Sequence, residues 1–383
     1  MGGKNVRKRI LMLAAFTFLG TTTLLAMGRR LEGALNPTLL WEKEFPSSII
    51  IDRNMKLARI TGDVMVTVYP ETREAEEIAG VYLFDKNGNE ISHWKKGFGT
   101  ISDNGEIILF TSGPTGAPFH NRVHYCTRDG QELWNGRIGE EVYISPDGGI
   151  VIDAAGEEDS TQLLEAYDHT GRKIWSYKIG EEGIDVMFSP DSQYIVAAHG
   201  DANVRLYRRD GTLLWKKRNY GYIVSVSTSA SYISLSSGEV RWTSRSAPKG
   251  SSLPIVYDKD GNIIYKDVFA KVSEDGKKLV VSHNESIEIL SLPEKVFSKT
   301  YPLAKDFLTM SYNGKYLAIL GRRTDVASSN NLFVIDTVED KIWETEIQPK
   351  GKSEFNQMQV FLTKDGKYML IQGKGKLYYY QLY

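Results

Sequence analysis

One turn recurs along most of this 383-residue chain, and its spacing restricts the possible folds more than any other feature. A short polar segment that ends in glycine separates two apolar, strand-like segments. The glycines of this turn are Gly88, Gly130, Gly171, Gly211 and Gly261, so successive turns lie 42, 41, 40 and 50 residues apart. A period of about 40 residues is typical of solenoids, propellers and other repeat arrays.

A second turn recurs between these glycines. Aspartate and asparagine bond to their own backbone and glycine accepts a positive φ, so both turns fit short hairpin loops. The flanking segments are rich in β-branched and aromatic residues and are too short for helices. Each repeat therefore predicts four antiparallel strands, the content of one propeller blade. The second turn is SDNG from Ser102, SPDGG from Ser145, SPDSQY from Ser189, SEDGKK from Ser273, SYNGKY from Ser311 and TKDGKY from Thr363.

Counting the second turn predicts an all-β fold, an eight-bladed β-propeller of four-stranded antiparallel blades. Two of the turns are degenerate, at residues 52–54 and 229–231. Seven blades with one irregular hairpin is the alternative. The last blade ends after a third strand at residues 377–383, whereas residues 38–45 carry the TLLW pattern of an outermost strand. We therefore expect the N-terminal strand to complete the last blade, which removes an exposed sheet edge.

Tryptophan marks the outermost strands. A large ring at this position can wedge against the next blade and bury surface that one sheet cannot cover. We therefore expect these rings in the core rather than at a cofactor. Trp94 is displaced by two residues, and Tyr265 and Phe297 replace the tryptophan in two blades. The equivalent positions are Trp41, Trp134, Trp175, Trp215 and Trp343.

Residues 1–30 form a separate unit. Four basic residues between Lys4 and Arg9 precede an uncharged run at residues 10–28, which is long enough to cross roughly 30 Å of hydrocarbon. The pattern predicts an exported protein, periplasmic or extracellular, with either a cleaved signal peptide or an N-terminal transmembrane anchor. A linker at residues 31–37 leads to the propeller at residues 38–383. The expected membrane contact is residues 10–28, if they are retained.

Composition and motifs narrow the chemistry. A net charge of -1 gives no general attraction to nucleic acid. Cys126 is the only cysteine, so no intramolecular disulfide can form, and we expect a buried strand residue. The six histidines lack zinc-site spacing, and neither a G-x-S-x-G motif nor a phosphate-binding loop occurs. We therefore expect no cofactor, no metal and no catalytic residues, and an enzyme is the less favoured class.

Residues 186–215, VMFSPDSQYIVAAHGDANVRLYRRDGTLLW, carry a family resemblance. The SPD turn and the VRLY strand resemble WD-repeat propellers, and the D-x-x-G-x-x-x-W ending is similar to pyrroloquinoline-quinone-type repeats. The resemblance implies a scaffold that presents a surface. Quinone-dependent dehydrogenases with this repeat are generally longer, and many have adjacent cysteines. The propeller lipoprotein that assists outer-membrane β-barrel assembly is also similar, but its lipobox cysteine is absent here.

The connections between the second and third strands of each blade are long, and loops of a rigid scaffold can carry function. The longest, at residues 236–254, holds Trp242 beside Arg241 and Arg245. Aromatic and arginine side chains are common anchors of protein interfaces. We hypothesise a partner-binding surface there, to which Phe119, Arg122, Arg322 and Arg323 also contribute.

The sequence thus favours a non-enzymatic platform that binds another envelope or membrane protein through the long-loop side of the propeller. One alternative is a hydrolase- or lyase-type enzyme that acts on an extracellular small molecule or glycan at the central channel. A second alternative is a ligand sensor.

Overall fold

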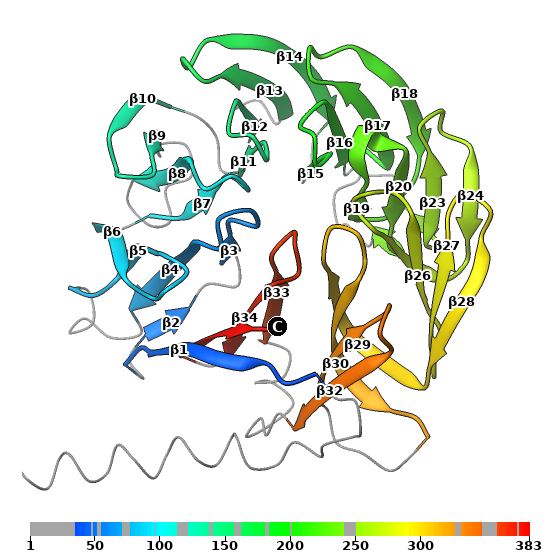
Figure 1. Ribbon diagram of the computed structural model, residues 1–383. Coiled ribbons are helices and arrows are strands. Elements are labelled where there is room, and N and C mark those ends of the chain that lie inside the picture. The colour runs from blue at the N-terminus through cyan, green and yellow to red at the C-terminus, as the bar shows by residue number, and fades with distance from the viewer. Residues whose placement is uncertain are drawn as a thin grey trace, which may run out of the picture.

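The fold is a closed ring of small sheets, seen in the computed structural model of the chain (Figure 1). Eight antiparallel blades surround one centre, each a sheet of four strands except the first, which has one additional short strand. This arrangement confirms the eight-bladed, all-β prediction over the seven-bladed alternative. The only helical element among the described residues is one 3-10 turn, η3 (Thr228–Ala230). The structure describes residues 35–46, 49–51, 55–70, 77–95, 97–112, 122–137, 141–156, 162–180, 184–199, 201–240, 250–325, 331–346, 358–373 and 375–383.

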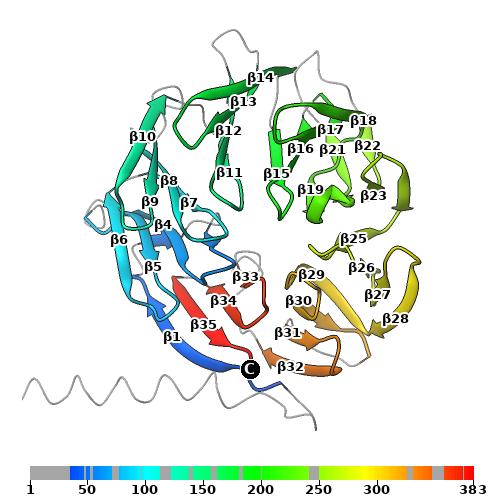
Figure 2. The same cartoon turned by 45° about the horizontal axis from the view of Figure 1, so that its top comes forward.

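The blades follow one another around the ring, and each runs from an innermost to an outermost strand (Figure 2). Blade 1 comprises β2 (Ile49–Ile51) with β3 (Lys56–Leu57), β4 (Val64–Pro70), β5 (Gly80–Phe84) and β6 (Glu90–Lys95). Blade 2 comprises β7 (Gly99–Ile101), β8 (Ile107–Ser112), β9 (Arg122–Thr127) and β10 (Glu132–Arg137), and blade 3 comprises β11 (Glu141–Ile144), β12 (Ile150–Gly156), β13 (Gln162–Asp168) and β14 (Lys173–Gly180). Blade 4 comprises β15 (Ile184–Phe188), β16 (Tyr194–His199), β17 (Asn203–Arg208) and β18 (Leu213–Arg218).

The second half of the ring repeats the pattern. Blade 5 comprises β19 (Ile223–Val226), β20 (Tyr232–Leu235), β23 (Ile255–Asp258) and β24 (Ile263–Lys266). Blade 6 comprises β25 (Phe269–Val272), β26 (Lys278–Ser282), β27 (Ile287–Ser291) and β28 (Val296–Tyr301), and blade 7 comprises β29 (Leu303–Met310), β30 (Tyr316–Arg323), β31 (Asn331–Asp336) and β32 (Lys341–Glu346). Blade 8 comprises β33 (Gln359–Leu362), β34 (Tyr368–Gly373), β35 (Lys376–Gln381) and β1 (Thr38–Glu44). A separate hairpin, β21 (Gly238–Val240) with β22 (Gly250–Ser252), follows β20 and precedes β23 in the chain, whereas β20 and β23 pair directly with each other.

The turn between the first and second strands shows why its sequence pattern recurs. In blade 3 the Ser145 hydroxyl donates to an Asp147 carboxylate oxygen at 2.6 Å and accepts from the Ile150 amide at 2.9 Å. The Gly148 amide donates to the Ser145 carbonyl, and Gly148 takes a φ of 76°, which glycine adopts without the steric cost of a side chain. Serine, aspartate and glycine thus each satisfy one requirement of the hairpin.

The outer-strand tryptophans pack on the next blade, as predicted. The Trp215 indole N–H donates to the Lys259 carbonyl at 2.8 Å, and its ring covers Gly261 in the turn of blade 5. Trp175 makes the corresponding bond to the Arg209 carbonyl of its own neighbour turn at 3.1 Å. In these two blades the indole ring therefore bonds a carbonyl of the following turn and lies against the glycine two residues further on.

Closure of the ring also follows the prediction. β1 pairs antiparallel with β35, so the N-terminal strand becomes the outermost strand of the last blade. Trp41 stacks on Tyr379 with ring centroids 5.1 Å apart, and its indole N–H donates to the Lys86 carbonyl of blade 1 at 2.9 Å. The Tyr379 hydroxyl donates to the Gly62 carbonyl. The two chain ends are therefore joined to each other and to the first blade.

Two details of the prediction were wrong. The first-blade turn lies at residues 58–63, where the Ala58 amide donates to the Asp63 carbonyl and Gly62 has a φ of 83°. Residues 52–54 lie outside the described residues. Phe297 is 58% exposed rather than core. The turn of blade 7 that would receive its ring, residues 336–341, contains no glycine against which a ring can lie flat. Cys126, by contrast, is buried in β9 as expected.

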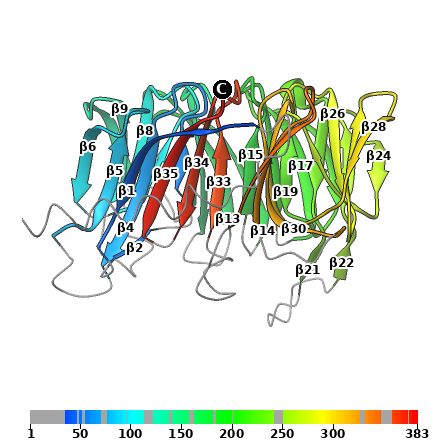
Figure 3. The ribbon, with the colours of Figure 1, turned by 60° about the horizontal axis from the view of Figure 1, so that its bottom comes forward.

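The ring has two unlike faces, which Figure 3 shows edge-on. One face carries the hairpins between first and second and between third and fourth strands; we call it the short-turn face. The other carries the connections between second and third strands and from blade to blade, and β21 and β22 project from it; we call it the long-loop face. None of the described residues forms a helix that could cross a membrane, and the predicted segment at residues 10–28 is not among them.

Candidate partner-binding surface

The predicted interface residues are only partly within the described structure. Phe119, Arg241, Trp242 and Arg245 lie outside the described residues. Arg122 begins β9 in blade 2, and Arg322 and Arg323 end β30 in blade 7. All three described arginines border the long-loop face, but they occupy different sectors of the ring. The structure therefore does not gather them into one patch with blade 5.

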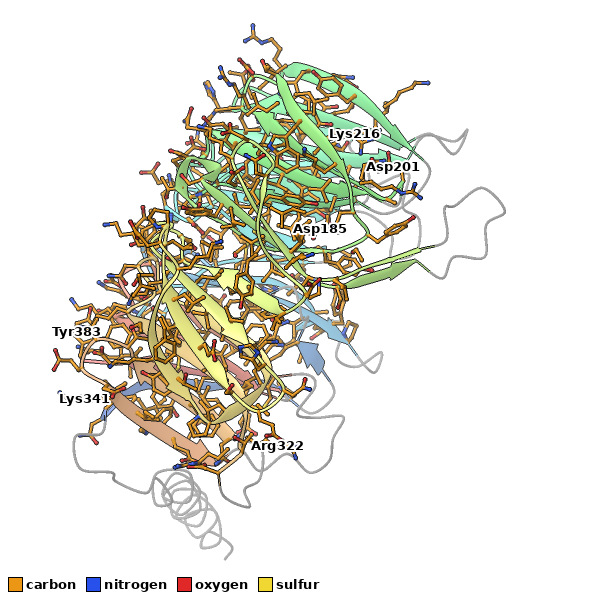
Figure 4. All side chains as sticks on the ribbon, turned by 90° about the vertical axis from the view of Figure 1, so that its right-hand side faces the viewer. Asp185, Asp201, Lys216, Arg322, Lys341 and Tyr383 are labelled. Atoms are coloured by element: carbon orange, nitrogen blue, oxygen red, sulfur yellow. The ribbon has the colours of Figure 1, made fainter. Side chains whose placement is uncertain are left out.

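The two adjacent arginines of blade 7 differ in their surroundings. Arg323 donates two hydrogen bonds to the Asp325 carboxylate, at 2.9 and 2.6 Å, and a Glu344 oxygen lies 3.8 Å away. These carboxylates raise the pKa of Arg323 and neutralise its charge. Arg322 points to the opposite side of the strand and is exposed at the end of the blade (Figure 4). Arg322 is the better placed of the two to meet another molecule.

The base of the blade 5 insertion is well defined. The Asn219 side-chain oxygen accepts from the Gly221 amide at 2.6 Å and from the Ser252 hydroxyl at 3.0 Å. The Tyr220 amide donates to the same Ser252 hydroxyl. Arg218 lies over the Tyr220 ring and donates to its hydroxyl at 2.9 Å. The hairpin of β21 and β22 is thus fixed to the link between blades 4 and 5.

Two large apolar side chains stand exposed on this base. Tyr222 is 64% exposed and Leu253 is 63% exposed. The backbone around Tyr222 is fixed, because its carbonyl accepts from the Ser236 amide and the neighbouring Ile223 amide donates to an Asp185 carboxylate oxygen at 2.8 Å. Burial raises the pKa of Asp185, which lies between blades 4 and 5 (Figure 4). Exposed apolar surface on a rigid support favours binding of another molecule.

Sequence reasoning predicted a partner surface in the blade 5 insertion but did not name Tyr220, Tyr222 or Leu253. The signal was available in NYGYI at residues 219–223, where two tyrosines flank a glycine directly after an outer strand. Their exposure depends on how the insertion folds back onto the link between the blades, which spacing alone does not reveal.

The central channel is partly filled at its short-turn end. Arg59 of blade 1 forms an ion pair with Glu274 of blade 6 and donates to the carbonyls of Met310 and Leu362, each at 3.3 Å. Burial lowers the pKa of Arg59. Lys271 donates to the Leu308 carbonyl at 3.3 Å. Arg59 therefore contacts blades 6, 7 and 8 from blade 1, so its role is to stabilise the ring at the channel.

Lys271 adds a second cation to this end of the channel. Burial, with a further contribution from the positive charges of Arg59 and Lys305, lowers the pKa of Lys271 to about 8. Lys305 lies over the Phe269 ring at 3.6 Å. Lys271 therefore lies near two other basic side chains, Arg59 and Lys305.

Comparisons with known proteins agree with the propeller fold and the repeat type. A family profile described as "Outer membrane protein assembly factor BamB" matches residues 120–233, from the start of β9 into blade 5. No curated protein matches the chain in sequence. Among solved structures, the C-terminal WD40 domain of Sif2 is similar with a TM-score of 0.55 at 10% identity, covering 91% of this chain and 99% of that domain. The resemblance to WD-repeat and pyrroloquinoline-quinone-like propellers is confirmed at the level of the fold.

Proposed function

We propose that the protein is a binding platform of the cell envelope that holds another envelope or membrane protein on its long-loop face. The observation that carries this proposal is the exposed pair Tyr222 and Leu253 on the rigid base of the blade 5 insertion. The likeness to an outer membrane protein assembly factor supports the same class of role, because that family's description concerns assembly of other proteins. Binding of this kind requires no catalytic group.

The proposed contact extends beyond these two side chains. A stable protein interface buries about 800 Å² on each partner, far more than one tyrosine and one leucine supply. Arg241, Trp242 and Arg245 follow β21 directly, so we include them in the same surface. Tryptophan, tyrosine and arginine are the side chains whose truncation most often costs binding energy. Phe119, Arg122, Arg322 and Arg323 would contribute only to a partner that covers several blades.

The expected location follows from the N-terminal segment. An exported chain would place the propeller in the periplasm or outside the cell, and a retained anchor at residues 10–28 would hold it next to the membrane, within reach of other envelope proteins. The ring would then act as a fixed support for a partner on the face that carries the variable loops.

The test is recovery of a partner after in-cell crosslinking and purification of the tagged full-length protein. We expect one partner in stoichiometric amount with the wild type, and at least a tenfold loss with a Tyr222→Ser, Leu253→Ser variant. Val338→Ser is the matched control, because Val338 is 62% exposed on the short-turn face. Equal recovery from both variants, or no partner with the wild type, would refute the platform.

A further inference from the structure

Three polar side chains of blade 2 are arranged as a nucleophile, a base and an orienting carboxylate. The Ser112 hydroxyl lies 2.6 Å from the His124 Nε2 atom, and the His124 Nδ1 atom lies 2.5 Å from a Glu132 carboxylate oxygen. The residues belong to three adjacent strands, at the end of β8, within β9 and at the start of β10. Nucleophile and base within hydrogen-bond reach, with the base oriented by a third group, is the geometry that activates a serine.

The hydrogen bonds around these residues favour one tautomer of the histidine. Glu132 also accepts from the Asn135 amide group, and Asn135 in turn accepts from Arg122. With both Glu132 oxygens occupied as acceptors, His124 donates from Nδ1, and Nε2 is left to accept the Ser112 proton. The bonds from His124 and Asn135 lower the pKa of Glu132. Glu132 therefore remains ionised and can stabilise a protonated His124.

The histidine ring is held in place by packing as well as by hydrogen bonds. His124 stacks on Phe110 with ring centroids 4.6 Å apart, and Phe110 stacks on Trp94 of blade 1 at 5.2 Å. Trp94 is one of the outer-strand tryptophans that pack on the next blade, so the packing between blades 1 and 2 holds the His124 ring in place. A catalytic group needs such a support, because small displacements of a base cost large factors in rate.

Arg122 supplies positive charge beside the serine. It pairs directly with Ser112 in the β8–β9 ladder, so the two side chains leave the same face of the sheet. Directly opposed residues have Cβ atoms about 4.5–5.5 Å apart. Its guanidinium carries five N–H donors, and Asn135 receives one of them. The remaining donors can face an oxygen that becomes negative next to Ser112.

An exposed aromatic surface flanks the serine. Phe98 is 47% exposed and packs edge-on against Tyr69 at 5.4 Å. Its backbone is joined to Thr111, the residue before Ser112, by bonds in both directions: the Thr111 amide donates to the Phe98 carbonyl, and the Phe98 amide donates to the Thr111 hydroxyl. An apolar group of a substrate bound at Ser112 would have Phe98 to pack against.

We propose that Ser112, His124 and Glu132 form a catalytic triad for hydrolysis of carboxylic esters with an apolar group, with Arg122 as the oxyanion stabiliser. This site is distinct from the proposed partner surface in blade 5. Ser112 Oγ attacks the ester carbonyl carbon while its proton moves to His124 Nε2, and the carbonyl electron pair moves onto oxygen beside Arg122. Collapse of this intermediate expels the alcohol, which leaves with the proton from His124.

Water completes the turnover. It attacks the acyl-serine carbonyl while His124 Nε2 accepts one water proton. The second tetrahedral intermediate releases the carboxylic acid, and the proton on His124 returns to Ser112 Oγ. One ester and one water give one acid and one alcohol, and no other reactant is required.

The test uses the purified full-length protein with an alkyl fluorophosphonate and with p-nitrophenyl butyrate. We expect phosphonylation at Ser112, located by peptide mass spectrometry, and ester hydrolysis that Ser112→Ala abolishes. His124→Gln should lower the rate at least about 100-fold, the usual size of a general-base contribution. Arg122→Ala should lower kcat more than it raises KM, because the guanidinium acts on the transition state.

Ser282→Ala is the matched control. Ser282 ends the second strand of blade 6, as Ser112 does in blade 2, but its hydroxyl donates to the His283 carbonyl rather than to an imidazole nitrogen. This variant should keep full labelling and full activity. Absence of labelling in the wild type, or equal labelling of wild type and the folded Ser112→Ala variant, would overturn the proposal.

Discussion

Two tryptophans at equivalent positions differ in one hydrogen bond, and this difference gives a quantitative prediction. Trp215 packs at a tilted angle against Tyr257, covers Gly261 and donates its indole N–H to the Lys259 carbonyl. Trp134 stacks on Tyr125 and covers Gly171 in the same way. Its indole nitrogen, however, is buried with no hydrogen-bond partner among the described residues. Replacing each tryptophan by phenylalanine removes the same atoms.

The expected free energies follow from this contrast. Trp215→Phe loses a hydrogen bond worth about 1 kcal/mol, whereas Trp134→Phe removes an unsatisfied buried donor that costs about 1 kcal/mol or more. The cost of the smaller ring is common to both variants. Trp215→Phe should therefore unfold with a free energy about 2 kcal/mol below that of Trp134→Phe.

Urea unfolding followed by far-ultraviolet circular dichroism measures this difference directly. Both variants should retain the strand spectrum of the wild type, because the ring still covers the neighbouring glycine. Equal losses of stability in the two variants would refute the claim that the indole N–H, rather than ring volume alone, joins adjacent blades.

Two further predictions concern the channel and the hairpins. Because the folded pKa of Lys271 lies near 8, below its ordinary value of 10.5, the unfolded chain binds more protons between these values and stability rises with pH across them. Lys271→Met should therefore stabilise the protein most below pH 8 and lose this advantage above pH 10.5, in urea titrations at both ends of the window; an advantage that does not change with pH would contradict the assignment. Gly148→Ala should cost about 1–2 kcal/mol, since its φ is 76° and a Cβ would lie 2.7 Å from Ile107, whereas Gly136→Ala, with 3.7 Å to the nearest side chain, should cost less in the same assay. Equal losses of stability in the two variants would show that the positive φ and close contact at Gly148 do not determine the cost of the substitution.

The blades could be predicted from the sequence because local chemistry determines them. Each turn needs serine, aspartate and glycine at fixed offsets, as at Ser145 to Gly148, and each outer strand needs a ring that fits the next turn. The prediction was wrong where that chemistry changes. The first-blade turn uses Gly62 without the serine pattern, and Phe297 faces a turn that has no glycine.

The candidate sites could be predicted only in part, because they depend on register and on folding between blades. The insertion in blade 5 was evident from the 50-residue gap, but the exposure of Tyr222 and Leu253 was not. Ser112 and His124 are 12 residues apart, and His124 and Glu132 are 8 apart, on three strands. Their meeting depends on the pairing of β8, β9 and β10, which no short motif encodes.

The central claim is that a protein partner binds the long-loop face beside the blade 5 insertion. The most direct measurement places a photocrosslinking phenylalanine analogue at position 222, or at position 338 on the short-turn face, in the full-length protein in cells. The account predicts one dominant crosslinked partner at position 222 and none of that partner at position 338. Equal yields at both positions, or no specific adduct at position 222, would contradict it.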